Sequence, residues 1–332
     1  MILVTGGAGY IGSHIAVALH EAGHEFVLLD NFSNSSPALS GPLERIMGSA
    51  PTLVEGDIRD RNALEGIIKH HRVNWVIHCA GLKAVGESVS EPLRYFENNV
   101  VGTIRLLEAM TACGVKKLVF SSSATVYGDP VQLPIPESHP VAPTNPYGAT
   151  KAQIEIILES ICRSQPDWSV ANLRYFNPVG AHSSGLIGED PKGTPNNLMP
   201  YVARVATGEL QELQVFGSDY DTPDGTGVRD YIHVMDLAEG HIAAMTRVSN
   251  GFHTFNLGTG QGYSVLDMLS AFERASGCSI PRRLVARRAG DVATCFADSS
   301  KAKRMLNWVA KRGLDEMCES TWHHQSLAKA IR

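Results

Sequence analysis

The first twelve residues of the chain, MILVTGGAGYIG (residues 1–12), decide its fold. The apolar run before the glycines predicts a buried strand, and the periodic apolar segment after them predicts a helix. Gly6, Gly9 and Gly12 mark the junction, where glycine lets the backbone turn tightly, lets a pyrophosphate approach and lets the helix pack on its strand. A bound phosphate would then lie at the positive end of the helix dipole. Strand, turn and helix follow in the required order, which favours dinucleotide binding over a plain turn.

Apolar runs and helix-period segments continue to alternate through the first half of the chain. We expect strands over residues 2–4, 26–29, 53–54, 75–77, 118–120 and 170–173. We expect helices over residues 10–22, 63–70, 93–113 and 147–162. This alternation predicts an α/β fold, a doubly wound parallel sheet of Rossmann type with helices on both faces.

The second half of the chain is less regular. Residues 182–200 and 217–231 are rich in Gly, Pro, Asp and Asn, and we expect them to form long ordered loops with a functional role. We place a domain boundary near residue 175. Residues 1–175 then form the cofactor-binding domain, with part of 230–260 returning to it, and residues 176–332 form mainly a smaller, mixed α/β substrate domain.

Composition excludes several classes of protein. The chain has 332 residues, of which 29 are Lys or Arg and 34 are Asp or Glu, for a formal charge of -5. This balance excludes a strongly basic nucleic-acid binder. No apolar run approaches the ~18 residues of a membrane span, and we expect no signal peptide because the N-terminus lacks a basic region. The six cysteines are scattered without a CxxC pair, which indicates reduced thiols in a cytoplasmic protein, and no metal site is expected.

Two acidic positions after predicted strands suit the adenosine half of a dinucleotide. Asp30 ends the second strand, where a carboxylate accepts hydrogen bonds from both ribose hydroxyls. The same carboxylate would repel a 2′-phosphate, and Asn31 rather than an arginine follows it, so NAD is favoured over NADP. The alternative is that Asp30 only caps a turn. Asp57 and Ile58, after the third strand, are further candidates for the adenine pocket.

A second motif supplies candidate catalytic side chains. Tyr147 and Lys151 are four residues apart in a predicted helix, so they share one face. A free tyrosine has a pKa near ~10 and is a poor base at neutral pH, but a neighbouring ammonium and the positive nicotinamide ring of NAD+ both favour the phenolate. Ser123 lies after the fifth strand, at the edge where ligands bind in doubly wound sheets, and its hydroxyl can share the proton. The alternative is a surface tyrosine beside a solvated lysine.

Longer stretches make the pattern far more specific than the glycine turn. They are AGLKAVGES (80–88), SSSATVYGD (121–129), RYFNPVGAH (174–182), PNNLMPY (195–201) and DGTGVRDYIHVMDLA (224–238). Together with the glycine turn, Asp30 and the Tyr147–Lys151 pair, they give the chain a resemblance to the UDP-glucose 4-epimerase family of extended short-chain dehydrogenases/reductases. The resemblance extends from residue 1 to about 325.

The resemblance implies a redox-neutral isomerase that keeps NAD bound and interconverts UDP-glucose and UDP-galactose. Tyr147 would remove the proton from the sugar 4-hydroxyl while hydride passes from C4 to the nicotinamide. The 4-keto sugar would then present its other face, and hydride and proton would return with inverted configuration. Ser123 would bridge the 4-hydroxyl and the phenol, and Lys151 would hold the nicotinamide ribose. A homodimer is also implied, with residues 176–332 binding mainly the UDP-sugar.

The resemblance carries over to individual positions. The residues implied in cofactor binding are Gly6, Gly9, Tyr10, Ile11, Gly12, Asp30, Asn31, Phe32, Ser33, Asn34, Ser35, Asp57, Ile58, Cys79, Ala80, Gly81, Leu82, Lys83, Asn98, Ser123, Tyr147, Lys151 and Phe176. Those implied in binding the UDP-sugar are Ser123, Tyr147, Asn177, Asn197, Leu198, Gln214, Val215, Phe216, Arg229, Arg288, Asp291 and Cys295. Arginine suits a pyrophosphate because its guanidinium meets phosphate oxygens in a bidentate fork. For Arg229 and Arg288 the alternative is ordinary surface charge.

Cys295 is the informative position for substrate range. In this family a bulky tyrosine here limits the sugar pocket to glucose and galactose, whereas a small residue leaves room for a 2-acetamido group. Cys295 is small, so the resemblance implies that UDP-GlcNAc and UDP-GalNAc are also substrates. The alternative is that the thiol only fills core space, as a free cysteine often does.

Three other functions compete with epimerisation. A nucleotide-sugar 4,6-dehydratase needs an Asp-Glu pair after the strand-end hydroxyl, where this chain has Ala124 and Thr125. An NAD-dependent dehydrogenase that releases its cofactor is compatible with the two short motifs, but the long stretches argue against it. A regulator that has lost catalysis should lack part of the Ser123, Tyr147 and Lys151 set, which is complete.

Overall fold

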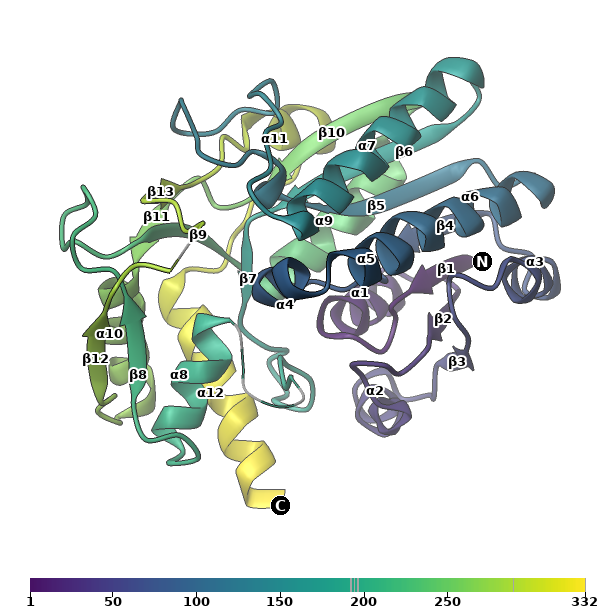
Figure 1. The fold of residues 1–332 in the computed structure, drawn as a ribbon. Coiled ribbons are helices and arrows are strands. Elements are labelled where there is room, and N and C mark those ends of the chain that lie inside the picture. Colours follow the sequence, from purple (N-terminus) through teal and green to yellow (C-terminus); the bar gives the residue numbers. More distant parts are fainter. Residues whose placement is uncertain (192, 194, 196, 289, 332) are drawn as a thin grey trace.

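A seven-stranded parallel sheet lies at the centre of the larger part of the molecule (Figure 1). The computed structural model describes residues 1–191, 193, 195, 197–288 and 290–331. The strands lie in the order β3-β2-β1-β4-β5-β6-β10, and all neighbours are parallel. Their bounds are β1 Ile2–Thr5, β2 Phe26–Asp30, β3 Thr52–Glu55, β4 Trp75–His78, β5 Lys117–Ser123, β6 Ser169–Tyr175 and β10 Gly251–Leu257. The doubly wound parallel sheet predicted from the sequence is confirmed.

Helices cover both faces of this sheet, because its central strands are apolar on both sides. On one face α1 packs against α9, and on the other α3 packs against α6 (Figure 1). The helices of this part are α1 Tyr10–Glu21, α2 Ser40–Met47, α3 Arg61–His70, α4 Val85–Ser90, α5 Pro92–Tyr95, α6 Gly102–Ala112, α7 Pro146–Ser164, α9 Val234–Arg247 and α11 Ser300–Leu306, with short 3-10 turns at η1 Pro37–Leu39 and η3 Ala124–Val126. None of the helices in the described ranges combines the length and the apolar character that crossing a membrane requires.

The helix predicted over residues 93–113 is not uniform. Helix α5 leads into a π-helical segment at Phe96–Val101 (η2), and only from Gly102 does the regular helix α6 begin. The apolar periodicity predicted one α-helix because it does not report a local change in the backbone hydrogen-bond pattern. Such π-helical turns are often found at functional sites, and this one carries the buried side chain of Asn99.

The smaller part of the molecule is built around β9. This strand pairs with β7 and β13 in parallel and with β11 antiparallel, while β8 and β12 form a separate parallel pair. The elements are β7 Asn177–Val179, α8 Leu198–Ala206, β8 Leu213–Phe216, β9 Val228–His233, β11 Gly262–Ser264, α10 Val265–Ser276, β12 Arg282–Val285, β13 Thr294–Cys295 and α12 Leu314–Ile331.

The two predicted loops are shorter than the sequence suggested. The prediction for 182–200 was wrong at its end, because α8 begins at Leu198. The prediction for 217–231 was also wrong at its end, because β9 begins at Val228. Buried apolar residues follow within a few positions, from Met199 in α8 and from Tyr231 in β9, so each regular element begins where the chain approaches the core.

The chain returns to the larger sheet after β9. Helix α9 packs on α1, β10 extends the sheet beside β6, and α11 packs against both α9 and β10. A division of the chain near residue 175 remains a prediction.

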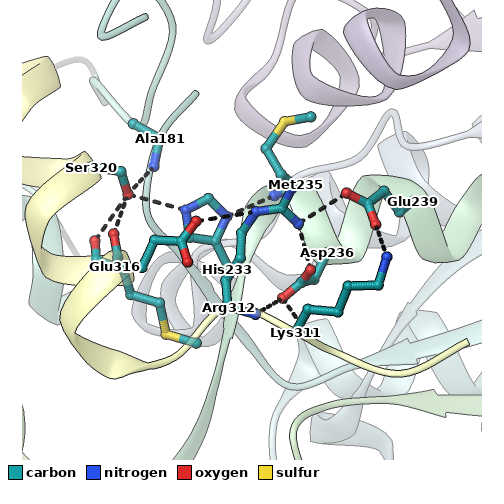
Figure 2. A network of polar contacts seen from close by, with 10 residues as sticks. Ala181, His233, Met235, Asp236, Glu239, Lys311, Arg312, Glu316 and Ser320 are labelled. Carbon is teal, nitrogen blue, oxygen red and sulfur yellow. Dashed lines mark hydrogen bonds and ion pairs between the residues drawn. The ribbon is translucent and has the colours of Figure 1, made fainter. Parts of the chain in front are cut away.

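A polar network joins α9 to the segment that leads into α12 (Figure 2). The Asp236 side chain is fully buried and accepts hydrogen bonds from the backbone N–H groups of Lys311, at 3.0 Å, and Arg312, at 2.8 Å. The Arg312 guanidinium pairs with Asp236 and also with Glu239, the latter at 2.9 Å. The Asp236 carboxylate therefore replaces water for several donors and fixes where the C-terminal helix begins.

The same network reaches the smaller part through α12. The Ser320 hydroxyl lies 3.1 Å from His233 Nε2 and accepts a hydrogen bond of 3.2 Å from the backbone N–H of Ala181 (Figure 2). On its other side, the His233 Nδ1 atom accepts from the backbone N–H of Met235 and caps α9. Helix α12 thus connects the end of β9, the segment after β7 and helix α9.

We expect Asp236→Ala to lower the free energy of unfolding by about 3 kcal/mol, because the backbone N–H groups of Lys311 and Arg312 lose their acceptor and the Arg312 guanidinium loses one of its carboxylate partners. Urea denaturation followed by circular dichroism measures this change. Lys311→Ala is the matched control: the Lys311 side chain is 70% exposed and its ammonium lies 3.5 Å from Glu239, so its loss should cost less than about 1 kcal/mol. Equal losses for the two variants would contradict the anchoring role of Asp236.

Candidate active site

The glycine turn lies directly against the segment that follows β4. Gly6 has a φ of +69°, and a Cβ atom there would lie 2.7 Å from the backbone nitrogen of Ala80. A Cβ atom on Gly12 would lie 2.1 Å from the carbonyl oxygen of Gly6. Only glycine allows this close approach of backbone to backbone. Helix α1 begins after Gly9 without a side-chain cap, so its N-terminus is open to an anion.

Asp30 lies beside this turn at the end of β2. Its Oδ2 atom accepts a hydrogen bond of 2.9 Å from the backbone N–H of Ala8. Its Oδ1 atom accepts from the backbone N–H of Phe32, at 2.9 Å, and from the Ser35 hydroxyl, at 2.7 Å. The buried carboxylate therefore shapes residues 31–35, as the turn-capping alternative expects, and also faces the glycine turn. Its contact with a ribose remains a prediction.

Asp57 and Ile58 lie beyond β3. Arg59 donates two hydrogen bonds to the Asp57 carboxylate, from Nε at 2.9 Å and from Nη2 at 2.8 Å, and the Asn31 amide donates a third at 3.0 Å. These donors hold the pKa of Asp57 well below its usual range. The Ile58 side chain is buried, and a Cβ atom on Gly102 of α6 would lie 2.7 Å from its Cδ1 atom.

Asn99 holds the segment of predicted cofactor contacts that runs from Cys79 to Lys83. Its Oδ1 atom accepts from the backbone N–H of Leu82, at 2.8 Å, and its Nδ2 atom donates to the Leu82 carbonyl oxygen, at 3.0 Å. The same amide donates to the Thr150 hydroxyl of α7, at 3.2 Å. Sequence reasoning missed Asn99. The available signal was a polar amide inside an apolar, helix-period segment.

A second buried chain of polar groups fixes the start of that segment. The Ser121 hydroxyl donates to the Cys79 sulfur at 3.1 Å and lies 2.6 Å from the Tyr175 hydroxyl. Tyr175 also contacts His241 of α9. Burial raises the pKa of Cys79 to about 11, so the group is a thiol at neutral pH. Sequence reasoning missed Tyr175 and His241.

The structure brings the three predicted catalytic residues to one place. Ser123 ends β5, and its Oγ atom accepts a hydrogen bond of 2.9 Å from the Thr125 hydroxyl. Tyr147 lies in the first turn of α7, and Lys151 follows one turn later. The Lys151 ammonium donates to the Ser121 carbonyl oxygen at 2.7 Å and lies 5.9 Å from the centre of the Tyr147 ring.

Burial dominates the electrostatics of this group. It raises the pKa of Tyr147, and the hydrogen bond with Ser123 opposes the rise without cancelling it. Burial also lowers the pKa of Lys151 to about 8. The sequence predicts two positive charges that stabilise the phenolate, the Lys151 ammonium and the nicotinamide ring of NAD+. The protein supplies one of them, and with protein groups alone Tyr147 stays a phenol at neutral pH.

Arg229 and Cys295 face each other across the pairing of β9 with β13. The Arg229 guanidinium donates to the carbonyl oxygens of Val228, at 2.9 Å, and Ala293, at 3.4 Å. Cys295 is partly buried against the apolar cluster that contains Phe176. Burial raises the pKa of its thiol to about 11, so the side chain is neutral and small.

The other predicted substrate residues lie on β8 and the loops near it. Phe216 is 39% exposed and lies 5.5 Å from the Arg288 guanidinium, which pairs with Asp291 at 3.0 Å. Gln214 also faces outward, whereas the Val215 side chain is buried because successive strand residues point to opposite faces. Any ligand contact of Val215 therefore comes from its backbone.

The remaining predicted substrate residues are Asn177, which is exposed at the start of β7, and the adjacent pair Asn197 and Leu198 at the start of α8. In the part of the chain that the structure describes, no group of three or more His, Cys, Asp or Glu side chains is arranged to hold a metal ion.

Comparison with known proteins finds a match along most of the chain. Residues 2–258 match the NAD dependent epimerase/dehydratase family. The UDP-glucose 4-epimerase of Bacillus subtilis (strain 168) is 59% identical over 327 residues, which cover 98% of this chain and 96% of the relative.

Solved structures are equally similar. A UDP-glucose-4-epimerase from Stenotrophomonas maltophila, with bound NAD and formylated UDP-arabinopyranose, has a TM-score of 0.97 at 50% identity and covers 100% of this chain and 99% of its own. A UDP-glucose 4-epimerase from Bifidobacterium longum, in complex with NAD+ and UDP, has a TM-score of 0.96 at 51% identity, and the match covers 99% of this chain and 98% of that one.

We expect Asn99→Asp to weaken NAD binding at least about tenfold, since a carboxylate keeps the acceptor for the Leu82 N–H but sets an oxygen against the Leu82 carbonyl. Titration of the NAD-free protein, followed by tryptophan fluorescence, measures the affinity. Asn99→Ala should weaken it similarly. Near-normal affinity of Asn99→Asp, which preserves side-chain size, would show that only the volume at this position matters.

Proposed function

The chain belongs to the NAD-dependent epimerase/dehydratase family, and on this premise we propose that it interconverts UDP-glucose and UDP-galactose by inverting C4 of the sugar. One observation carries the proposal: Ser123, Tyr147 and Lys151 meet next to the segment after β4, which packs on the glycine turn, in a chain that matches UDP-glucose 4-epimerases over 98% of its length. Sequence similarity supplies the substrate class, and the geometry supplies residues that can move a proton.

The residues present fit NAD as the cofactor. A Cβ atom at Gly6 would strike the Ala80 backbone, so the turn and the segment after β4 form a close cradle that only glycine permits. The helix N-terminus at Gly9 would receive the pyrophosphate, and Asp30 would receive the adenosine ribose. When bound, NAD supplies the acceptor and later the donor of the C4 hydride.

Tyr147 is the acid–base residue in this proposal. Its phenolic oxygen takes the proton of the 4-hydroxyl and returns it to the opposite face of the 4-keto sugar, so one group acts as base and then as acid. Ser123 holds the phenol and the sugar oxygen through its hydroxyl. Lys151, fixed by the Ser121 carbonyl oxygen, supplies the positive charge that favours the phenolate.

The competing chemistry of a dehydratase finds no acid and base in this site. The two residues after Ser123 are Ala124 and Thr125, and the Thr125 hydroxyl is hydrogen-bonded to Ser123 at 2.9 Å. Neither ionises near neutral pH, so removal of a proton from the next carbon and loss of water have no group to perform them.

N-acetylated UDP-sugars extend the proposed substrate range. Cys295 supports this extension because it presents a small, neutral side chain on β13, opposite Arg229 and against the cluster that contains Phe176. A tyrosine at the same position would add a ring to that face of the site. UDP-GlcNAc and UDP-GalNAc are therefore proposed as a second substrate pair.

A homodimer is the proposed assembly. The groove between α6 and α7 supports it, because the apolar side chains Ile104, Leu107, Ile157 and Ile161 line the groove together with the polar side chains of Arg61, Glu108 and Thr111. The neighbouring Ile156 is 63% exposed in the single chain. Isoleucines gathered on one outer face are typical of a surface that another protein chain covers.

Proton NMR of the purified protein with UDP-galactose, and no added cofactor, tests the main proposal. We expect conversion to UDP-glucose with no oxidised or dehydrated sugar. Tyr147→Phe should lower kcat at least about 10²-fold while leaving the circular dichroism spectrum unchanged, since only the phenolic oxygen is lost. Oxidised product that appears only with added NAD+ would indicate a releasing dehydrogenase instead, and normal turnover by Tyr147→Phe would remove this residue from the mechanism.

Cys295→Tyr tests the substrate range. We expect this variant to lose UDP-GalNAc turnover by about 10²-fold and to keep UDP-galactose turnover within about threefold, because the added ring occupies the space of the 2-acetamido group. Cys295→Ala is the control and should keep both activities. Equal effects of Cys295→Tyr on the two sugars would contradict a selective role for this position.

A further inference from the structure

Glu189 joins residues from the two halves of the site. Its Oε1 atom accepts a hydrogen bond of 2.8 Å from the Lys83 ammonium and one of 2.7 Å from the Asn197 amide. Its side chain is 9% exposed, so the carboxylate has little access to water. Lys83 belongs to the segment after β4 that sequence similarity assigns to the cofactor, and Asn197 precedes α8, where similarity places the UDP-sugar. Glu189 itself was not among the predicted site residues.

The direction of the Asn197 amide shows what Glu189 does. Asn197 occupies the N-cap position of α8, yet its side chain makes no capping hydrogen bond. Asn145 occupies the same position in α7 and caps its helix through a hydrogen bond of 2.9 Å from the backbone N–H of Gly148. An asparagine at an N-cap favours that local bond. The Asn197 side chain makes no such bond, and its amide nitrogen donates to Glu189 at 2.7 Å.

Lys83 is held from two sides in the same way. Its ammonium lies on the Glu189 carboxylate and 5.9 Å from the centre of the Tyr10 ring. The Tyr10 hydroxyl donates to the Gly180 carbonyl oxygen at 2.7 Å, and so ties the start of α1 to the segment after β7. The Glu189–Lys83 contact therefore closes a second bridge between the same two parts of the molecule.

We propose that Glu189 is a positioning residue, which holds Lys83 and Asn197 in the arrangement that receives the UDP-sugar. This inference rests on the proposed function. The lysine side chain has four rotatable carbons and the asparagine amide rotates freely in water, so a shared acceptor removes conformational freedom before the ligand arrives. Glu189 does not touch the reacting carbon in this role.

Coulomb's law alone predicts the opposite effect on affinity. A carboxylate near the phosphates of UDP repels them, so removal of its charge would strengthen the binding of UDP. Loss of positioning would weaken it. The sign of the change in UDP affinity therefore shows whether Glu189 acts mainly by repelling the phosphates or by positioning its partners.

The test is isothermal titration of the NAD-loaded protein with UDP, for Glu189→Ala and Glu189→Gln. Positioning predicts that Glu189→Ala weakens UDP binding about tenfold, whereas Glu189→Gln, which keeps an acceptor oxygen, stays within about threefold of the unmodified protein. In turnover of UDP-galactose, Glu189→Ala should raise KM by a similar factor and change kcat by less than about twofold.

Glu212→Ala is the matched control. It removes a glutamate whose Oε1 atom lies 2.8 Å from Arg283, between β8 and β12, and its UDP affinity should not change. A second control is Asn197→Ala: Glu189→Ala added to it should weaken UDP binding by much less than about tenfold, because the two residues act as a unit.

Three outcomes would overturn the inference. Tighter UDP binding in both Glu189 variants would show that the carboxylate mainly repels the phosphates. Unchanged binding in both variants would show that Glu189 has no role in binding UDP. Equal weakening in Glu212→Ala would show a general effect of charge removal. Thermal melting of each variant separates all of these from unfolding. The titration does not depend on turnover. Absence of epimerisation by the unmodified protein would therefore contradict the proposed function, but the titration could still be interpreted.

Discussion

The close approach of two backbone segments is the constraint on which the site depends. Strands β1 and β4 are neighbours in the sheet although six other elements separate them in the chain order, so the turn after β1 and the segment after β4 leave the sheet side by side. The order of the strands reverses at this point, which is where doubly wound sheets bind their ligands. Without a side chain at Gly6 the two segments touch, and the carboxylate of Asp30 and the amide of Asn99 hold the backbone on either side of this junction.

Buried polar side chains, rather than regular structure, shape several loops of the molecule. Asp30 orders residues 31–35, Asn99 holds Leu82, and Asp230 accepts from the backbone N–H groups of Thr259, at 2.8 Å, and Gly260, at 2.9 Å. Each of these side chains satisfies backbone donors that no helix or strand reaches. The loops consequently have defined shapes before any ligand binds, and the side chains they carry need little further ordering.

Local patterns in the sequence were enough to predict the parallel sheet and to select the candidate catalytic residues. The glycine turn, the apolar strands and the spacing of Tyr147 and Lys151 each lie within a few residues, so their periodicity and chemistry can be recognised directly. The π-helical turn and the roles of Asn99 and Glu189 were not predictable in this way. The Lys83–Glu189 contact joins residues 106 positions apart, and it exists only because the smaller part of the molecule folds back over the end of the sheet.

The protonation of the site follows from the same burial that gives it shape. Burial raises the pKa of Tyr147 and lowers that of Lys151 to about 8, so at neutral pH Tyr147 is a phenol while Lys151 still carries most of its positive charge. In such surroundings a nearby charge acts more strongly than it would in water. A positive charge beside Tyr147 then lowers its pKa, whereas the same charge would have a small effect on an exposed tyrosine. Under the proposed function, Tyr147 would therefore be a phenol in the protein alone and would gain the character of a base once a bound ligand added a second positive charge, which would couple proton transfer to assembly of the site.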